Sequence, residues 1–70
     1  MPKLPGVSHP RAVLAFEKAG FRVVRQGKHI FMKRGDQTLV LPRGNPINAY
    51  TMAGIVRESG MTVAEFKKLL

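Results

Sequence analysis

The stretch from Phe21 to Pro42 holds three short runs of strand-forming residues, and two glycine-containing turns separate them. The runs are residues 21–26, 29–33 and 38–42. They are rich in β-branched, aromatic and leucine side chains, which favour extended backbone. The turns, Gly27-Lys28 and residues 34–37, are short and contain turn-forming residues. The segment therefore predicts a three-stranded antiparallel meander.

Helical patterns lie on both sides of this segment. Before it, Ser8 is placed to cap a helix whose apolar residues recur at helical spacing until Gly20, which supplies a left-handed stop. After it, a loop over residues 43–48 leads to a second helix, which Gly60 closes. Thr62 and Glu65 then match a capping box that opens a short last helix. Apolar positions of the three helices are Ala12, Val13, Phe16 and Ala19, then Met52, Ile55 and Val56, then Val63 and Phe66.

The predicted fold is α+β, with the order helix, three-stranded antiparallel sheet, helix and short C-terminal helix. Seventy residues suffice for one domain, which we place over residues 1–70. A sheet this small needs cover on one face, and the helices are the available cover. In the second strand, the period of two places Ile30 and Met32 on the helix side. His29, Phe31 and Lys33 then lie on the opposite, open side.

The charge of the chain is strongly unbalanced. Twelve Lys and Arg residues against four Asp and Glu give a net charge of +8, which attracts polyanions. Nucleic acid is the leading class of partner; a membrane surface fits less well, because the basic residues accompany strands rather than one amphipathic helix. An acidic protein partner is compatible with the same charge. The chain has no cysteine, and no signal peptide or bilayer-spanning stretch is apparent, so we expect a cytoplasmic protein.

The segment from Arg25 to Arg34 carries the residues best suited to chemistry. A histidine can take up or release a proton near neutral pH, so His29 is a candidate general acid or base. Four cations around it, Arg25, Lys28, Lys33 and Arg34, are candidates to hold a phosphodiester. The scattered acidic residues and two distant histidines do not predict a metal centre, and no cofactor is expected. Cleavage of a phosphodiester would then use the RNA 2′-hydroxyl as an internal nucleophile.

Two other readings of these residues stay open. His29 can be a solvated strand histidine on a basic surface that binds RNA without cleaving it. The charge can also serve only an acidic protein partner. His9 is expected to be an ordinary residue in the first turn of a helix.

Several segments of the chain resemble the HicA toxins of bacterial type II toxin–antitoxin pairs. They are Leu4-Pro5, Ala19-Gly20-Phe21, residues 23–29, Leu41-Pro42, and Ile55 to Thr62 with Glu65-Phe66. The resemblance extends over nearly the whole chain. It implies a fold like that of double-stranded-RNA-binding domains, an endoribonuclease activity on mRNA, and a HicB-type antitoxin that covers the active face. A membrane partner is not implied.

The resemblance also assigns roles to single residues. The family carries its catalytic histidine in a turn of Gly-Ser-His type, which maps the histidine onto His29 and the glycine onto Gly27. Lys28 stands at the serine position and is expected to add a phosphate contact. A second departure lies at residues 50–53, where Tyr-Thr-Met-Ala replaces the Gly-Thr-Leu-Arg that often opens the family's penultimate helix. The expected site is therefore catalytic His29 with RNA contacts from Arg25, Gly27, Lys28, Lys33 and Arg34.

Overall fold

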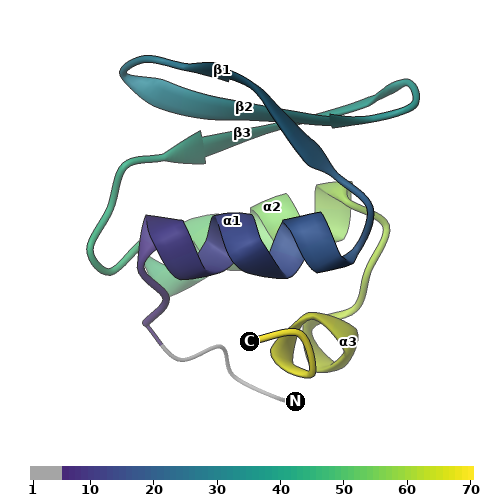
Figure 1. The fold of residues 1–70 in the computed structure, drawn as a ribbon. Coiled ribbons are helices and arrows are strands. Elements are labelled where there is room, and N and C mark those ends of the chain that lie inside the picture. The colour runs from purple at the N-terminus through teal and green to yellow at the C-terminus, as the bar shows by residue number, and fades with distance from the viewer. Residues whose placement is uncertain (1–5) are drawn as a thin grey trace.

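A three-stranded sheet lies over two helices, and a third helix lies beyond them on the side away from the sheet (Figure 1). The computed structural model of the chain describes residues 6–70. Its elements are α1 (His9–Lys18), β1 (Arg22–Gln26), β2 (His29–Arg34), β3 (Gln37–Pro42), α2 (Ala49–Glu58) and α3 (Val63–Lys67). This is the α+β layout predicted from the sequence. Within residues 6–70, no helix combines the length and hydropathy that crossing a bilayer requires.

The strands follow one another across the sheet in the order β1-β2-β3, and both pairs are antiparallel. The pairing of β2 with β3 is regular from His29↔Pro42 to Arg34↔Gln37. The pairing of β1 with β2 shifts register between Val23 and Arg25. The predicted meander is thus confirmed, with one irregularity in β1.

Local signals place the ends of the helices. Gly20 and Gly60, which follow α1 and α2, have φ angles of 100° and 87°, a region that side-chain-bearing residues rarely enter. At α2, the Asn48 side chain caps the first turn by accepting from the backbone N–H of Tyr50 at 2.8 Å. The predicted capping box of α3 is present. Ser8 occupies the N-cap position of α1, but its side chain makes no capping hydrogen bond.

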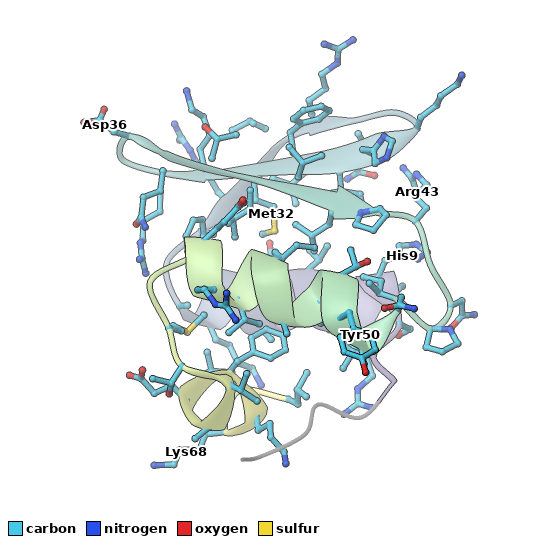
Figure 2. All side chains as sticks on the ribbon, turned by 180° about the vertical axis from the view of Figure 1, so that it is seen from behind. His9, Met32, Asp36, Arg43, Tyr50 and Lys68 are labelled. Carbon is cyan, nitrogen blue, oxygen red and sulfur yellow. The ribbon has the colours of Figure 1, made fainter. Side chains whose placement is uncertain are left out.

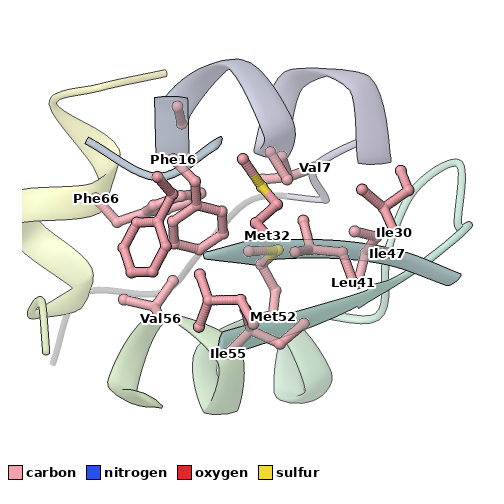
Figure 3. Packing of buried hydrophobic residues seen from close by; sticks show 14 residues of the cluster. Val7, Phe16, Ile30, Met32, Leu41, Ile47, Met52, Ile55, Val56 and Phe66 are labelled. Atoms are coloured by element: carbon pink, nitrogen blue, oxygen red, sulfur yellow. The ribbon is translucent and has the colours of Figure 1, made fainter. Parts of the chain in front are cut away.

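The core fills the space between the sheet and the helices (Figure 3). Met32 and Leu39 of the sheet and Met52 of α2 are fully buried in it. Phe16 joins the layers, because its ring lies 4.9 Å from the ring of Phe66 in α3. Fully burying a side chain of this size stabilises a fold by about 1.5–3 kcal/mol. The predicted placement of the helices on the Ile30/Met32 side is confirmed, and this placement leaves the other side of the sheet uncovered (Figure 1).

Candidate functional site

The uncovered side of the sheet presents alternate residues of β2. Ile30 and Met32 are buried beneath it, whereas His29 and Lys33 are exposed and Phe31 is half-buried between them. This confirms the predicted alternation, which follows because successive side chains of a strand point to opposite faces.

The neighbouring strands add further residues to this side, since directly paired residues of an antiparallel sheet point the same way. Arg22 of β1 pairs with Lys33, and Arg25 pairs with Phe31. Thr38 and Val40 of β3 pair with Lys33 and Phe31 from the other side. We call the resulting surface the open face; it consists of Arg22, Arg25, His29, Phe31, Lys33, Thr38 and Val40.

A bulge in β1 decides which arginines reach the open face. Arg22 and Arg25 are three positions apart, so unbroken alternation would send them to opposite sides of the sheet. The register shift between Val23 and Arg25 leaves Val24 as an extra residue, and the two arginines end on the same side. Sequence reasoning missed Arg22 because a bulge leaves no clear mark in the pattern of residue types.

The charged residues of the open face are all positive. Arg22, Arg25 and Lys33 are exposed on it, and Lys28 is exposed in the adjoining turn. The acidic residues lie elsewhere, in α1, the β2–β3 turn, α2 and α3: Glu17, Asp36, Glu58 and Glu65. Among residues 6–70, no three His, Cys, Asp or Glu side chains gather as potential metal ligands. The face therefore complements an anionic ligand, with its cations uncompensated by neighbouring carboxylates.

His29 is the first residue of β2 and lies where the open face meets the β1–β2 turn. Its backbone carbonyl accepts a hydrogen bond from the N–H of Gly27 at 3.1 Å, which closes the turn. Across the sheet it pairs with Pro42, the last residue of β3. The imidazole is exposed, and within residues 6–70 no side chain or carbonyl forms a hydrogen bond with it. It is thus accessible to a ligand lying on the open face.

Gly27 and Lys28 form the exposed turn between β1 and β2, directly before His29. Gly27 is not at a positive φ angle, and a Cβ placed on it would have open space around it. Both of its backbone polar groups have partners: its N–H bonds to His29, and its carbonyl accepts from Arg43 Nε at 2.7 Å. Gly27 consequently offers a ligand room to approach, and Lys28 offers an exposed charge.

The structure sets Arg34 apart from the other predicted RNA-binding residues. It shares the helix side of β2 with Ile30 and Met32, and its guanidinium is half-buried. Nη1 donates to the Ala19 carbonyl at 2.8 Å, Nη2 donates to the Ser59 carbonyl at 3.0 Å, and the Gln37 side chain accepts from both Nε and Nη2. The guanidinium also lies 4.4 Å from the centre of the Phe21 ring. These contacts point Arg34 away from the open face, so it is not carried into the proposed RNA contacts.

His9 lies in the first turn of α1, as predicted, and makes contacts that the sequence did not suggest. Its Nδ1 lies 3.0 Å from the carbonyl oxygen of Gly44, and its backbone N–H donates to the same oxygen at 2.9 Å. The start of α1 is thereby fixed to the loop that follows β3. Figure 2 shows His9 and Arg43 side by side at this end of the molecule.

A family model described as HicA toxin of bacterial toxin-antitoxin matches residues 11–61 of the chain. The matched segment contains the sheet, the β1–β2 turn and His29. No curated protein and no solved structure matches the chain. Since the match covers well over half of the chain, the protein belongs to the HicA toxin family and is the toxin of a toxin–antitoxin pair with a cognate antitoxin as partner.

Proposed function

We propose that the toxin is an endoribonuclease that cleaves mRNA without a metal ion or cofactor and uses His29 as its general acid or base. The observation that carries the proposal is the position of His29: an exposed imidazole at the margin of a basic face on which no acidic residue lies. Such a surface holds a phosphodiester by charge and brings a proton-transferring group to it.

The chemistry needs only the substrate and this group. The RNA 2′-oxygen forms a bond to phosphorus, the bond from phosphorus to the 5′-oxygen breaks, and a 2′,3′-cyclic phosphate and a 5′-hydroxyl result. His29 takes the proton from the 2′-hydroxyl or, in its protonated form, gives one to the departing 5′-oxygen. Either role typically contributes about 10²–10⁴-fold in rate. DNA lacks the nucleophile and is not a substrate.

The cations near His29 have a separate role in this scheme. Arg25 on the open face and Lys28 in the turn are exposed close to it along the chain, and Lys33 lies further along the same face of β2. They bind phosphate oxygens and neutralise the charge that develops during the reaction. Arg22, which pairs with Lys33, extends the same positive track.

We propose a HicB-type protein as the antitoxin and the open face as the surface that it covers. The middle of the face is apolar, because half-buried Phe31 pairs with Val40, which is 43% exposed. Acidic and apolar groups of the antitoxin complement this combination. Chemical modification of the His29 imidazole should therefore be fast in the isolated toxin and slow in the complex. Equal rates in the two states would exclude direct masking.

A non-catalytic RNA-binding module is the second candidate, and the isolation of His29 favours it. The acidic residues within residues 6–70 lie in α1, the β2–β3 turn, α2 and α3, so none is placed to orient the imidazole, in contrast to sites in which a base is held by a third group. This candidate predicts salt-sensitive RNA binding and no products. A surface that serves only protein association predicts neither cleavage nor RNA binding by the isolated toxin.

The deciding experiment is a cleavage assay in EDTA that compares the wild type with His29→Ala on RNA and on the same strand with 2′-deoxy sugars. We expect cleavage of the RNA alone and a loss of about 10²–10⁴-fold in the variant. His29 is exposed, so the variant should unfold at the wild-type temperature, which thermal unfolding checks. A folded His29→Ala protein that cuts as fast as wild type would exclude the proposed mechanism. Binding without products in both proteins would favour the second candidate.

A further inference from the structure

Arg43 lies at the same end of the sheet as His29, although the two are far apart in the chain. It directly follows Pro42, the residue of β3 that pairs with His29. Its Nε donates to the carbonyl of Gly27 at 2.7 Å, and the N–H of the same Gly27 donates to the carbonyl of His29. One turn residue thus links the guanidinium of Arg43 to the backbone of His29.

The guanidinium of Arg43 keeps most of its donors unused. An arginine has five N–H donors, and a planar fork of Nη groups matches the oxygens of a phosphate. In the part of the chain that the structure describes, the Nε contact to Gly27 is the only hydrogen bond of this guanidinium, and the side chain is exposed. The Nε bond orients the group, and the Nη fork is left to a ligand.

The backbone that carries Arg43 is fixed on both sides. Before it, Pro42 is held in the β2–β3 ladder. After it, the N–H of Gly44 donates to Pro42 and its carbonyl accepts two hydrogen bonds from His9. Gly44 also sits so close to the following loop that a Cβ on it would lie 2.9 Å from Cα of Ile47. A guanidinium on a fixed backbone and with one fixed nitrogen loses little freedom when it binds.

We infer that Arg43 binds, through its Nη fork, the RNA phosphate on which His29 acts. The inference rests on the proposed function of the same site and adds to it a cation from the β3–α2 loop. In this arrangement Arg25 and Lys28 would reach the phosphate from β1 and the β1–β2 turn. Arg43, which borders a pocket together with His9 and Ile30, would reach it around the end of β3. The phosphate is then held from two directions, as its alignment with a single imidazole requires.

The test measures binding of a 2′-O-methyl RNA strand, which has no 2′-hydroxyl to attack phosphorus, across about 50–200 mM salt. Arg43→Ala should weaken binding by about tenfold at the lowest salt, as loss of a charge-assisted contact predicts. The slope of the logarithm of the association constant against log salt is negative, and Arg43→Ala should make it less steep by about 0.7, the value for one phosphate contact on a single strand. Arg43→Lys, which keeps the charge without the fork, should restore the slope and only part of the affinity.

Arg57→Ala is the matched control. It removes the same side chain from an exposed position in the last turn of α2, in the helical layer rather than the sheet, and should leave both affinity and slope at their wild-type values. If Arg43→Ala is folded and behaves like Arg57→Ala, the inference is overturned, even when the wild type cleaves RNA. If Arg43→Ala lowers the melting temperature but leaves the slope unchanged, Arg43 only stabilises the β1–β2 turn, and the inference is again overturned. If Arg43→Ala lowers the slope but the wild type does not cleave RNA, the phosphate contact of Arg43 is supported and the proposed catalysis is excluded.

Discussion

The two turns of the sheet lie at its opposite ends (Figure 1), and an arginine side chain is hydrogen-bonded near each of them. At the β2–β3 turn, Arg34 directs its donors to Ala19, Ser59 and Gln37. At the β1–β2 turn, Arg43 directs one donor to Gly27 and leaves the others to solvent within the described chain. The same type of side chain therefore joins the layers at one end and keeps exposed donors, which we propose bind RNA, at the other.

The difference arises from the carbonyl groups to which each guanidinium donates hydrogen bonds. Ala19 and Ser59 are the C-cap residues of α1 and α2, where carbonyl groups lack partners and a cation is favoured. Arg34 reaches both of these carbonyls from one strand, so it ties the sheet to the two helices. At the opposite end, the hydrogen bond that Arg43 makes within residues 6–70 is the one to Gly27. We expect substitutions at the first end to change stability and those at the second to change RNA binding.

The largest expected effect on stability is that of Arg34→Leu. The variant loses four hydrogen bonds and the contact with Phe21. The Ala19 carbonyl loses its side-chain donor, and the Ser59 carbonyl keeps only Gln37 Nε2, at 3.3 Å. Because the group is only half-buried, we expect a loss of about 2 kcal/mol, which lowers the melting temperature of a domain of this size by about 10 °C. Thermal unfolding measures it. Arg57→Leu, at an exposed position, is the control and should change stability by less than about 0.5 kcal/mol.

The comparison of the two ends also predicts that Arg34→Leu leaves RNA binding unchanged. Below its melting temperature, the folded variant should bind 2′-O-methyl RNA with the wild-type salt slope, because Arg34 lies off the open face. A slope reduced as in Arg43→Ala, without a change in melting temperature, would return Arg34 to the RNA contacts and end the distinction between the two ends.

A smaller effect is expected for Gly44→Ala, which tests the support of Arg43. The new Cβ would lie 2.9 Å from Cα of Ile47 and 3.0 Å from the carbonyl oxygen of Pro46, so the loop must shift. We expect a loss of about 1–2 kcal/mol together with weaker RNA binding. Gly54→Ala is the control, since a Cβ there meets nothing within 4 Å inside α2 and should stabilise the helix by about 0.5–1 kcal/mol. Unchanged RNA binding in Gly44→Ala would show that Arg43 does not depend on this loop.

The smallest expected effect concerns α3, which lies beyond α1 and α2 on the side away from the sheet. The backbone N–H of Thr62, and then its side chain, donate hydrogen bonds that lower the pKa of Glu65 from its ordinary value of 4.5. A lowered pKa in the folded state contributes stability above the ordinary pKa, and this contribution is lost as the pH falls through the folded-state value. Between about pH 6 and pH 3, the melting temperature of Glu65→Gln should therefore fall less than that of the wild type. Parallel curves would contradict this role of Glu65.

The order of elements could be predicted because each signal is local. Gly20 and Gly60 end helices through their own backbone preference, and Thr62 with Glu65 caps α3 across a single turn. The side of the sheet that carries His29 follows from alternation within one strand. These features depend on neighbours in sequence, which the sequence displays directly.

The site could be predicted only in part, because its remaining features depend on distant partners. Arg34 bonds to carbonyls 15 and 25 residues away, and Arg43 bonds to one that is 16 residues away. Residue type and spacing do not reveal such contacts between backbone and side chain. The bulge at Val24, which brings Arg22 to the open face, likewise depends on how β1 fits against β2.

The most direct test of the central claim is to identify the ends of the products that the wild-type toxin forms from a short RNA in EDTA. Attack by the 2′-hydroxyl, with His29 transferring the proton, predicts a 2′,3′-cyclic phosphate on one fragment and a 5′-hydroxyl on the other. His29→Ala should form both about 10²–10⁴-fold more slowly. Mass spectrometry distinguishes these ends. Fragments with a 3′-hydroxyl and a 5′-phosphate would require an external nucleophile and would contradict the account.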